Sequence, residues 1–316
     1  RNYQPFMILI HLFAAAVYPF AQTKTIKSFY SSTPLLFWSM FFFWGTTCDM
    51  YSRSCRNPGY ATPEDEPGNT SKQQASEHPL VESESVEVSN NSEYFYCKIC
   101  KMYVPFRTSH CRTCGKCVIR KDHHCPFTNQ CIGRGNHCVF LFWCYCESIL
   151  MFLALYDLIF PLFHYSQFSK NPISKVSKEL QATTYPAPFQ TYAWSFLEWL
   201  NFFKLNVILI PFAAFCFLMT FLLSFQHTAM AAKNLTTWEV VKRSTITYLN
   251  KYPVTYNPFD KGIWKNIREF LLMQKDKTLW THLPAPSLSD FVYEQQFFSH
   301  EFFDSLIHTY SLFGIA

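Results

Sequence analysis

Charged residues and glycine are scarce in this chain of 316 residues. Lys, Arg, Asp and Glu make up 16% of it, whereas a typical soluble domain has about 25%, and only 8 residues are Gly. The net charge of +5 is small, and the basic residues do not form the concentrated cluster expected of a nucleic-acid-binding domain. The composition therefore argues against a soluble globular domain and against a nucleic acid as partner.

Apolar residues are abundant instead, at 49% of the chain with 34 Phe. A transmembrane helix needs about 20 mostly apolar residues, and four stretches are candidates: 5–22, 29–50, 138–165 and 205–225. Buried helices of a soluble protein are the competing interpretation, but the scarcity of charge across all four stretches disfavours it. The predicted fold class is an α-helical integral membrane protein with four transmembrane helices.

Two of these stretches are less regular than the others. Glu147 and Asp157 lie inside the third. Because charge is costly in lipid and such residues usually face the bundle interior, each is expected to line a cavity, to lie near a helix end or to form a structural pair, and the last two are favoured. The chain begins at Arg1 rather than Met, and the apolar run 8–21 has neither a clear basic start nor a cleavage site. We interpret that run as a membrane helix rather than a signal peptide.

The distribution of Lys and Arg predicts the orientation in the membrane. Residues 48–137 hold eleven of them and the tail from 227 holds nine, whereas the loop 166–200 holds three. Because cytosolic segments are enriched in basic residues, both of the first two segments are predicted to be cytosolic. The predicted organisation is transmembrane helices 1 and 2 in 1–50, a disordered cytosolic linker in 51–93, a zinc domain in 94–137, transmembrane helices 3 and 4 with a luminal loop in 138–226, and a cytosolic tail in 227–316.

A cysteine cluster lies between the second and third stretches. Seven of the 13 cysteines fall in residues 97–131, interleaved with three histidines. A disulfide framework is one alternative for such a cluster, but the histidines favour a metal and hence a reducing compartment. Both sulfurs of a Cys-x2-Cys turn can reach one ion, so two such pairs are natural half-sites: Cys97 with Cys100, and Cys111 with Cys114. The pair Cys114 with Cys117 could compete for the same role. No internal repeat is evident.

The number of potential ligands exceeds what two zinc ions need. Seven Cys and three His offer ten ligands, and two closed tetrahedral sites use eight. A spare thiol beside a spare imidazole is the composition of a cysteine nucleophile with its base. Asp122, His123 and Cys125 are the candidates, with the carboxylate orienting the imidazole, although spacing alone does not decide which two groups are spare. The alternative is that all ten serve metal binding or packing.

At this point the sequence resembles a known family, the DHHC-type palmitoyltransferases. The tetrad 122–125 lies in a cysteine-rich segment with the family's spacing, and the motifs Thr-Thr-Trp-Glu at 236–239 and Asn-Pro-Phe-Asp-Lys-Gly at 257–262 follow the fourth stretch. The resemblance covers about 57–267. Phe127 departs from the family's usual Trp, and Asn57 from its usual Asp. Further matching positions are Pro105, Arg107, His110 with Cys111, Cys131, Gly133, Asn136 and Phe140.

The resemblance implies which residues hold zinc and which remain free. It leaves Cys125 as nucleophile, His123 as base and Asp122 as the orienting carboxylate. Thr237 is expected to bond near Asp122, with a helix cap as its alternative role, and Asn266 is expected to support the site. The two implied structural zinc sites are Cys97, Cys100, His110 and Cys117, and Cys111, Cys114, His124 and Cys131.

The implied activity is protein S-acylation. A palmitoyl group would pass from palmitoyl-CoA, through an acyl-Cys125 intermediate, to membrane-proximal cysteines of substrate proteins, at the endoplasmic reticulum or Golgi with the zinc domain in the cytosol. The rivals are a non-catalytic zinc scaffold or adaptor, a ring-type ubiquitin ligase, and a channel or transporter. Basic residues of the zinc domain could bind CoA phosphates or anionic lipid, although most are expected to be ordinary surface charges: Lys101, Arg107, Arg112, Lys116, Arg120, Lys121 and Arg134.

Overall fold

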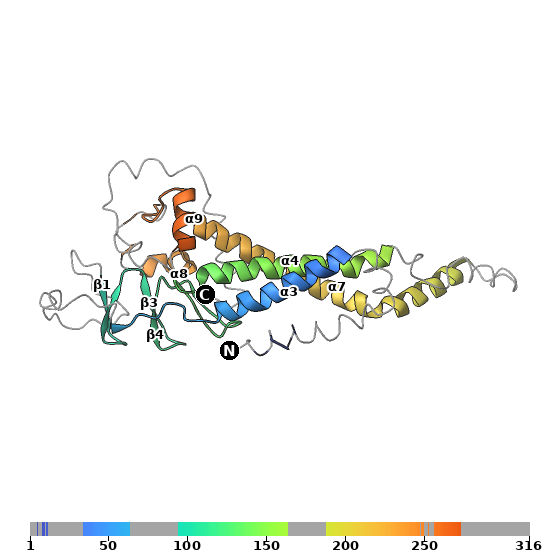
Figure 1. Cartoon of the computed structure of the whole chain (residues 1–316), viewed down its shortest axis with the longest axis horizontal. Helices are drawn as coiled ribbons and strands as arrows, with labels where there is room; N and C mark the ends of the chain where they lie inside the picture. Colours follow the sequence, from blue (N-terminus) through green and yellow to red (C-terminus); the bar gives the residue numbers. More distant parts are fainter. Residues whose placement is uncertain are drawn as a thin grey trace, which may run out of the picture. The chain divides into compact units, whose positions relative to one another are not determined.

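The computed structural model describes residues 34–63, 94–163, 188–246, 248–249, 252 and 256–272, together with residues 5, 8, 9 and 11 (Figure 1). Most of the predicted first transmembrane helix lies outside these residues. So do most of the predicted linker, residues 164–187 of the predicted luminal loop, and the tail from 273 onward. The described part consists of three long helices, three β-hairpins and two short C-terminal helices.

The chain divides into two compact units. One comprises Arg1–Gln4, Met50–Phe142 and Phe225–Ala316, and the other comprises Pro5–Asp49 and Trp143–Ser224. The first unit holds the cysteine cluster and the C-terminal motifs, and the second holds most of the long helices. Each unit is described by itself.

The long helices are α3 (Pro34–Ser54), α4 (His137–Phe163) and α7 (Pro188–Ala232). Two of the described helices are long and apolar enough to cross a membrane, over His137–Phe160 and Ile208–Ala232. The second of these helices leaves large apolar side chains exposed along its length. A lipid-facing helix does so, whereas the core helix of a soluble protein does not. The exposed side chains are Ile208, Phe212, Phe215, Leu218, Leu222 and Phe225.

These helices agree with the third and fourth predicted stretches in position, but their bounds differ. α7 begins 17 residues before the predicted start at 205 and continues seven residues beyond 225. The extension at its C-terminal end contains polar side chains, Gln226 and His227, which hydropathy alone excludes from a span. Both are buried in the first unit, where Nδ1 of His227 lies 3.0 Å from Nε2 of His137.

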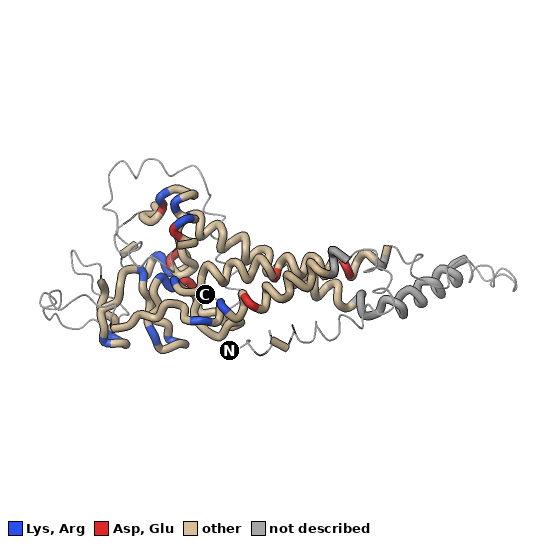
Figure 2. Tube along the Cα trace, viewed as in Figure 1, with Lys and Arg blue, Asp and Glu red and all other residues tan. Residues whose placement is uncertain are grey.

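The charged residues of the third predicted stretch are buried within the second unit. Glu147 is 5% exposed and lies 3.5 Å from the imidazole of His11. Asp157 is 1% exposed. Both side chains therefore avoid lipid, as the cost of placing charge in hydrocarbon requires. Figure 2 shows the corresponding distribution along the chain, with Lys and Arg on the hairpins and the C-terminal segments and almost none along the described parts of the long helices.

Three antiparallel hairpins form the cysteine-rich segment. β1 (Tyr94–Cys97) pairs with β2 (Met102–Pro105), β3 (Thr108–Cys111) with β4 (Lys116–Ile119), and β5 (His123–Cys125) with β6 (Gln130–Ile132). In the register, His110 lies opposite Cys117 and His124 lies opposite Cys131. Such short strands bury little apolar area, so zinc ligands are the expected source of their stability.

The hairpins are three copies of one unit, and the expectation of no internal repeat was wrong. The first strand of each ends in a cysteine, at Cys97, Cys111 and Cys125, spaced fourteen residues apart. The turns repeat too, since Lys101, Gly115 and Asn129, also fourteen apart, all have positive φ of 53°, 66° and 53°. The repeat is hard to see in the sequence because few residues besides the metal-binding ones are shared between copies.

The third hairpin is held by the end of α3 and the segment after it. The Gln130 amide donates to the carbonyl oxygens of Ser54 and Arg56 at 2.8 and 2.6 Å, and the Tyr51 hydroxyl donates to the carbonyl of Phe127 at 3.0 Å. Gly135 packs so closely on Asn57–Gly59 that a Cβ there would overlap the Asn57 carbonyl oxygen. Asn57 accepts from the amides of Gly59 and Tyr60 with its side-chain oxygen.

The C-terminal helices close the first unit. α8 (Thr237–Val241) begins with a capping box in which Thr236 accepts from the Glu239 amide and Glu239 accepts from the Thr236 amide. α9 (Ile263–Leu272) follows the Asn-Pro-Phe-Asp segment. An aromatic core joins this region to the first hairpin and contains Phe95, Phe106, Tyr248 and Phe259.

Candidate active site and metal centres

Two groups of four side chains in the hairpins have the geometry of zinc sites. The first is Cys97, Cys100, His110 and Cys117, and the second is Cys111, Cys114, His124 and Cys131. Ligand atoms around one tetrahedral zinc ion stand about 3.4–3.8 Å apart, given bond lengths of about 2.1–2.3 Å. The Sγ–Nδ1 and Sγ–Sγ separations are 3.3–3.9 Å in the first group and 3.3–3.8 Å in the second.

The backbone prepares each group for a thiolate. In both, the amide of the second cysteine of the Cys-x2-Cys turn donates to the sulfur of the first, at 3.4 Å for Cys100 to Cys97 and for Cys114 to Cys111. These hydrogen bonds favour the deprotonated form that binds metal. Three sulfurs and one imidazole form a closed donor set, which suits structural zinc and leaves no open position for substrate.

The third repeat has no such group. Cys125 occupies the place of Cys97 and Cys111, but Thr128 stands where the first two copies have their second cysteine. The Thr128 hydroxyl donates to the Cys125 carbonyl oxygen at 3.5 Å, and Thr128 contributes to lowering the pKa of the Cys125 thiol. Cys125 is 3% exposed and belongs to neither four-residue group. A thiol is therefore held in the same turn as a zinc ligand without the partners that would bind zinc.

An imidazole and a carboxylate lie next to this thiol. His123 bonds to Cys125 on one side and, through Nδ1, to Oδ2 of Asp122 at 2.7 Å on the other. Burial alone would raise the pKa of the Cys125 thiol, but the bond and positive charge of His123 bring it below its ordinary value. Burial would lower the pKa of His123, but its bonds to Asp122 and Cys125 raise it to about 9. Both shifts therefore favour a thiolate beside an imidazolium over the neutral pair.

Asp122 is buried, with its oxygens occupied by donors from a distant segment. The Thr237 amide donates to Oδ1 and its hydroxyl to Oδ2, both at 2.8 Å. Burial alone would raise the pKa of Asp122, but the neighbouring His137, His123 and His227 hold it well below its usual range. The two threonines at the start of α8 therefore have different contacts: Thr236 caps the helix, and Thr237 donates to the Asp122 carboxylate.

Asn266 ties α9 to the end of α7. Its amide donates to the Ala232 carbonyl at 2.7 Å and to Oδ1 of Asp260 at 2.6 Å, and its oxygen accepts from the Lys261 amide at 3.0 Å. It is fully buried. Asn266 therefore lies in the scaffold of the C-terminal motif, and these hydrogen bonds connect it to Ala232, Asp260 and Lys261 rather than to Cys125, His123 or Asp122.

Three of the basic residues expected on the surface are buried. Arg107 is 3% exposed, Arg120 is fully buried and Lys121 is 7% exposed. Arg107 donates to both carboxylate oxygens of Glu239 at 2.6 Å, and Lys121 lies over the Trp238 ring at 4.0 Å. The expectation of surface charge was wrong at these positions because partners more than 110 residues away in sequence enclose them, and they are not available to CoA phosphates or lipid.

The Arg107–Glu239 pair gives a stability prediction. Glu239→Ala leaves a guanidinium buried without its carboxylate, and such loss of one partner typically costs about 3–5 kcal/mol. The loss is measured as a lower midpoint of thermal unfolding in detergent. Lys261→Ala is the matched control, because Lys261 is half-exposed and its 2.8 Å pair with Glu269 lies at the surface. An equal loss in both variants would contradict this account of the buried pair.

Sequence reasoning missed two histidines near Asp122. His137, at the start of α4, and His227, near the end of α7, are both fully buried and bond to each other at 3.0 Å between Nε2 and Nδ1. Their nitrogens lie 3.8 and 3.9 Å from the Asp122 carboxylate. A polar side chain near the end of each apolar stretch was the available signal, but nothing in the sequence indicates that the two meet.

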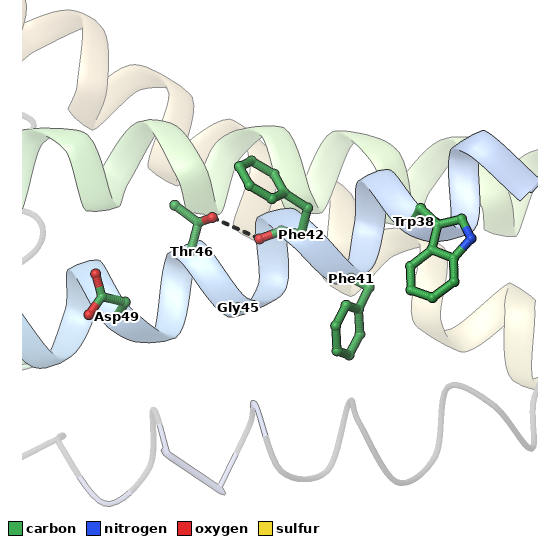
Figure 3. Close-up of a pocket in the computed structure, with 6 residues that line it drawn as sticks. All are labelled: Trp38, Phe41, Phe42, Gly45, Thr46 and Asp49. Atoms are coloured by element: carbon green, nitrogen blue, oxygen red, sulfur yellow. Dashed lines mark hydrogen bonds between the residues drawn. The ribbon is translucent and has the colours of Figure 1, made fainter.

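A shallow hollow on α3 has a different character. Figure 3 shows its lining side chains along one side of the helix, where the Thr46 hydroxyl donates to the Phe42 carbonyl at 2.8 Å. It has no cysteine, histidine or basic residue, and its aromatic side chains are exposed. This composition suits contact with apolar chains rather than chemistry. The lining is Trp38, Phe41, Phe42, Gly45, Thr46 and Asp49.

Comparison with known proteins identifies the region that contains this site. Residues 90–244 match a family model described as DHHC palmitoyltransferase. A putative ZDHHC-type palmitoyltransferase 7 of Dictyostelium discoideum is 28% identical over 195 residues, which are 61% of this chain and 38% of that protein. Palmitoyltransferase ZDHHC12-A of Danio rerio is 38% identical over 85 residues, 25% of this chain and 32% of that protein.

Palmitoyltransferase ZDHHC12 of Homo sapiens is 36% identical over 87 residues, which are 25% of this chain and 31% of the human protein. In each case the chain spans only about a third of the length of the curated relative that it matches. The matched family region includes all three hairpins, both four-residue groups and α8.

Proposed function

We propose that this chain, in which residues 90–244 form a DHHC palmitoyltransferase domain, is a protein S-acyltransferase with Cys125 as its nucleophile. One observation carries the proposal: Cys125 is a buried thiol outside both zinc groups, bonded to His123, which is in turn bonded to Asp122. A zinc scaffold or a ring-type ubiquitin ligase has no need of this arrangement, whereas covalent catalysis by cysteine requires it.

The acyl group would move in two transfers. In the first, the Cys125 thiolate attacks the carbonyl carbon of an acyl-CoA thioester, the carbon–sulfur bond to CoA breaks, and the departing thiolate takes the proton held by His123. In the second, His123 takes the proton of a substrate cysteine, whose sulfur attacks acyl-Cys125 and releases the Cys125 thiolate. Each transfer exchanges one thioester for another, so no oxidant or further reactant is needed.

Asp122 would act through His123 rather than on the substrate. Its Oδ2 accepts from Nδ1 of His123, which leaves the other ring nitrogen directed at Cys125. Thr237 fixes the carboxylate with two hydrogen bonds, one to Oδ1 and one to Oδ2, the oxygen that also accepts from His123. Thr237 is therefore proposed as a positioning residue that links the cysteine-rich hairpins to the C-terminal motif.

Zinc would hold the hairpins without entering the reaction. The eight ligands named above form two closed sets, and bound zinc supplies them with structural cross-links rather than a Lewis acid for the carbonyl. Since β5 and β6 contribute His124 and Cys131 to the second set, that set also fixes the hairpin that ends in Cys125.

The membrane arrangement proposed is four transmembrane helices, with the hairpins and C-terminal motifs on the cytosolic side. Two candidate spans in the described part, and a family that is membrane-embedded, support a membrane protein. The excess of Lys and Arg in 48–137 and after 227 supports the orientation. We further propose the endoplasmic reticulum or Golgi as its location, palmitoyl-CoA as donor, and proteins with membrane-proximal cysteines as acceptors.

Incubation of the purified full chain with palmitoyl-CoA tests this function. Mass spectrometry of the intact protein and of its peptides is expected to find one palmitoyl adduct on Cys125, removable by hydroxylamine because it is a thioester. Addition of a peptide with an N-terminal apolar segment and one cysteine is expected to discharge the adduct. An unmodified Cys125 in a protein that holds two zinc ions would overturn the proposal in favour of a zinc scaffold.

A further inference from the structure

His227 of α7 has a ring nitrogen that no described residue satisfies. The side chain is fully buried, and its Nε2 has no hydrogen-bond partner in the part of the chain that the structure describes. A buried polar atom left without a partner costs about 1–3 kcal/mol, so such atoms are rare and usually have a reason. The other nitrogen, Nδ1, bonds to Nε2 of His137 at 3.0 Å.

A chain of hydrogen bonds fixes which nitrogen of His227 carries the proton. The Arg120 guanidinium, which can only donate, lies 3.4 Å from Nδ1 of His137. Nδ1 of His137 therefore accepts, and the neutral ring carries its proton on Nε2. That N–H donates to Nδ1 of His227, with the Asp122 carboxylate 3.8 Å away as a second acceptor. His227 then carries its own proton on Nε2, which makes the unsatisfied atom a donor.

The imidazole rings of His227 and His123 lie next to each other at the Asp122 carboxylate. Nδ1 of each ring faces Oδ2 of Asp122, at 2.7 Å for His123 and 3.9 Å for His227. The two ring centroids are 5.7 Å apart and the planes are tilted by 38°. In each ring Nε2 lies on the far side from Nδ1, and in His123 that far side is the one bonded to Cys125. The unsatisfied Nε2–H of His227 therefore belongs to a ring that neighbours the one bonded to Cys125.

We infer that His227 is a further catalytic residue, whose Nε2–H donates to the carbonyl oxygen of the acyl thioester under attack by Cys125. This inference rests on the proposed acyl transfer. When the sulfur of Cys125 bonds to the carbonyl carbon, the C=O π pair moves onto oxygen, and the resulting oxyanion accepts the hydrogen bond from His227. When the C=O bond re-forms, the CoA thiolate leaves and takes the proton of His123. His227 keeps its proton throughout.

Two substitutions separate this role from a structural one. In His227→Gln the side-chain amide reaches the place of Nε2 and can donate there, whereas in His227→Asn the shorter side chain reaches only the place of Nδ1 and keeps the contact with His137. Two reactions are measured on each variant: acylation of Cys125 by palmitoyl-CoA, and alkylation of Cys125 by iodoacetamide, which expels iodide from a saturated carbon and forms no oxyanion.

The expected result is selective for acylation and for the Asn variant. Removing one oxyanion donor typically costs about 100- to 1,000-fold in rate, so His227→Asn is expected to lose that much acylation while alkylation is unchanged. His227→Gln is expected to retain most acylation. Thr220→Ala, on the same helix and bonded only to the preceding turn, is the matched control and is expected to react like the parent chain in both reactions.

Three outcomes would overturn the inference. They are wild-type acylation in His227→Asn, an equal loss of acylation and alkylation in that variant, and a His227→Gln variant as slow as His227→Asn. Failure of the proposed function has a separate signature, because the parent chain itself would then be alkylated at Cys125 but not acylated by palmitoyl-CoA.

Discussion

Cys125→Ser is expected to reduce acylation by palmitoyl-CoA to background while both zinc ions remain bound. The replacement keeps the shape of the side chain but removes the thiolate, and a serine hydroxyl is not ionised by an imidazole as a thiol is. Loss of the nucleophile in a triad enzyme typically costs about 10⁴- to 10⁶-fold. Hydroxylamine-sensitive labelling with an acyl-CoA analogue measures the activity, and elemental analysis measures zinc per chain.

The zinc content of Cys125→Ser tests whether Cys125 is itself a metal ligand. Cys125 occupies the repeat position of two zinc ligands, Cys97 and Cys111, so a loss of zinc in the variant would identify it as a ligand and contradict the proposed mechanism. Cys48→Ser is the control, because Cys48 is exposed on α3 and belongs to neither zinc group. It is expected to keep both the activity and the metal.

His123→Ala and His124→Ala are expected to fail in opposite ways although the residues are neighbours. His124 belongs to the second zinc group, and structural zinc contributes about 10–16 kcal/mol in small zinc domains. His124→Ala is therefore expected to hold one zinc ion instead of two and to unfold at lower temperature. His123→Ala is expected to hold both ions and to lose about 100- to 10,000-fold in acylation, the usual worth of a general acid–base group.

Zinc content and activity must be read together for this pair. A His123 variant that loses zinc would contradict the proposed division of the two histidines, and so would a His124 variant that keeps both ions. Alkylation of Cys125 by iodoacetamide adds an independent readout. It is expected to be slower in His123→Ala at neutral pH, because burial then raises the pKa of the Cys125 thiol with no imidazolium beside it to lower it.

The sequence was sufficient to predict the apolar stretches and the excess of metal ligands, because both are local. The apolar parts of the helices, predicted at 138–165 and 205–225, follow from hydropathy, and the number of potential ligands leaves two groups over beyond two closed zinc sites. The assignment of individual ligands needed the family resemblance. Spacing alone pairs Cys97 with Cys100, but which histidine and which later cysteine complete the set depends on the hairpin register.

The environment of the carboxylate could not be predicted from the sequence, because it is assembled from segments far apart. Asp122 is held by Thr237 and faced by His137 and His227, and the last two lie on different helices. The burial of Arg107 and Arg120 has the same origin, since Glu239 and Asn234 reach them from beyond α7. Isolated polar residues in apolar stretches show that partners are needed, but they do not say which.

The threefold repeat of the hairpins relates Cys125, the proposed nucleophile, to Cys97 and Cys111 of the two candidate zinc groups. A metal ion and a carbonyl carbon are both acceptors of a sulfur lone pair, and a turn that presents sulfur to one presents it equally well to the other. Chelation needs a second sulfur in the same turn, and Thr128 in place of that cysteine leaves Cys125 as a single donor. Under the proposed function, the residue at the second position of this repeated turn thus separates permanent binding of an ion from brief binding of an acyl group.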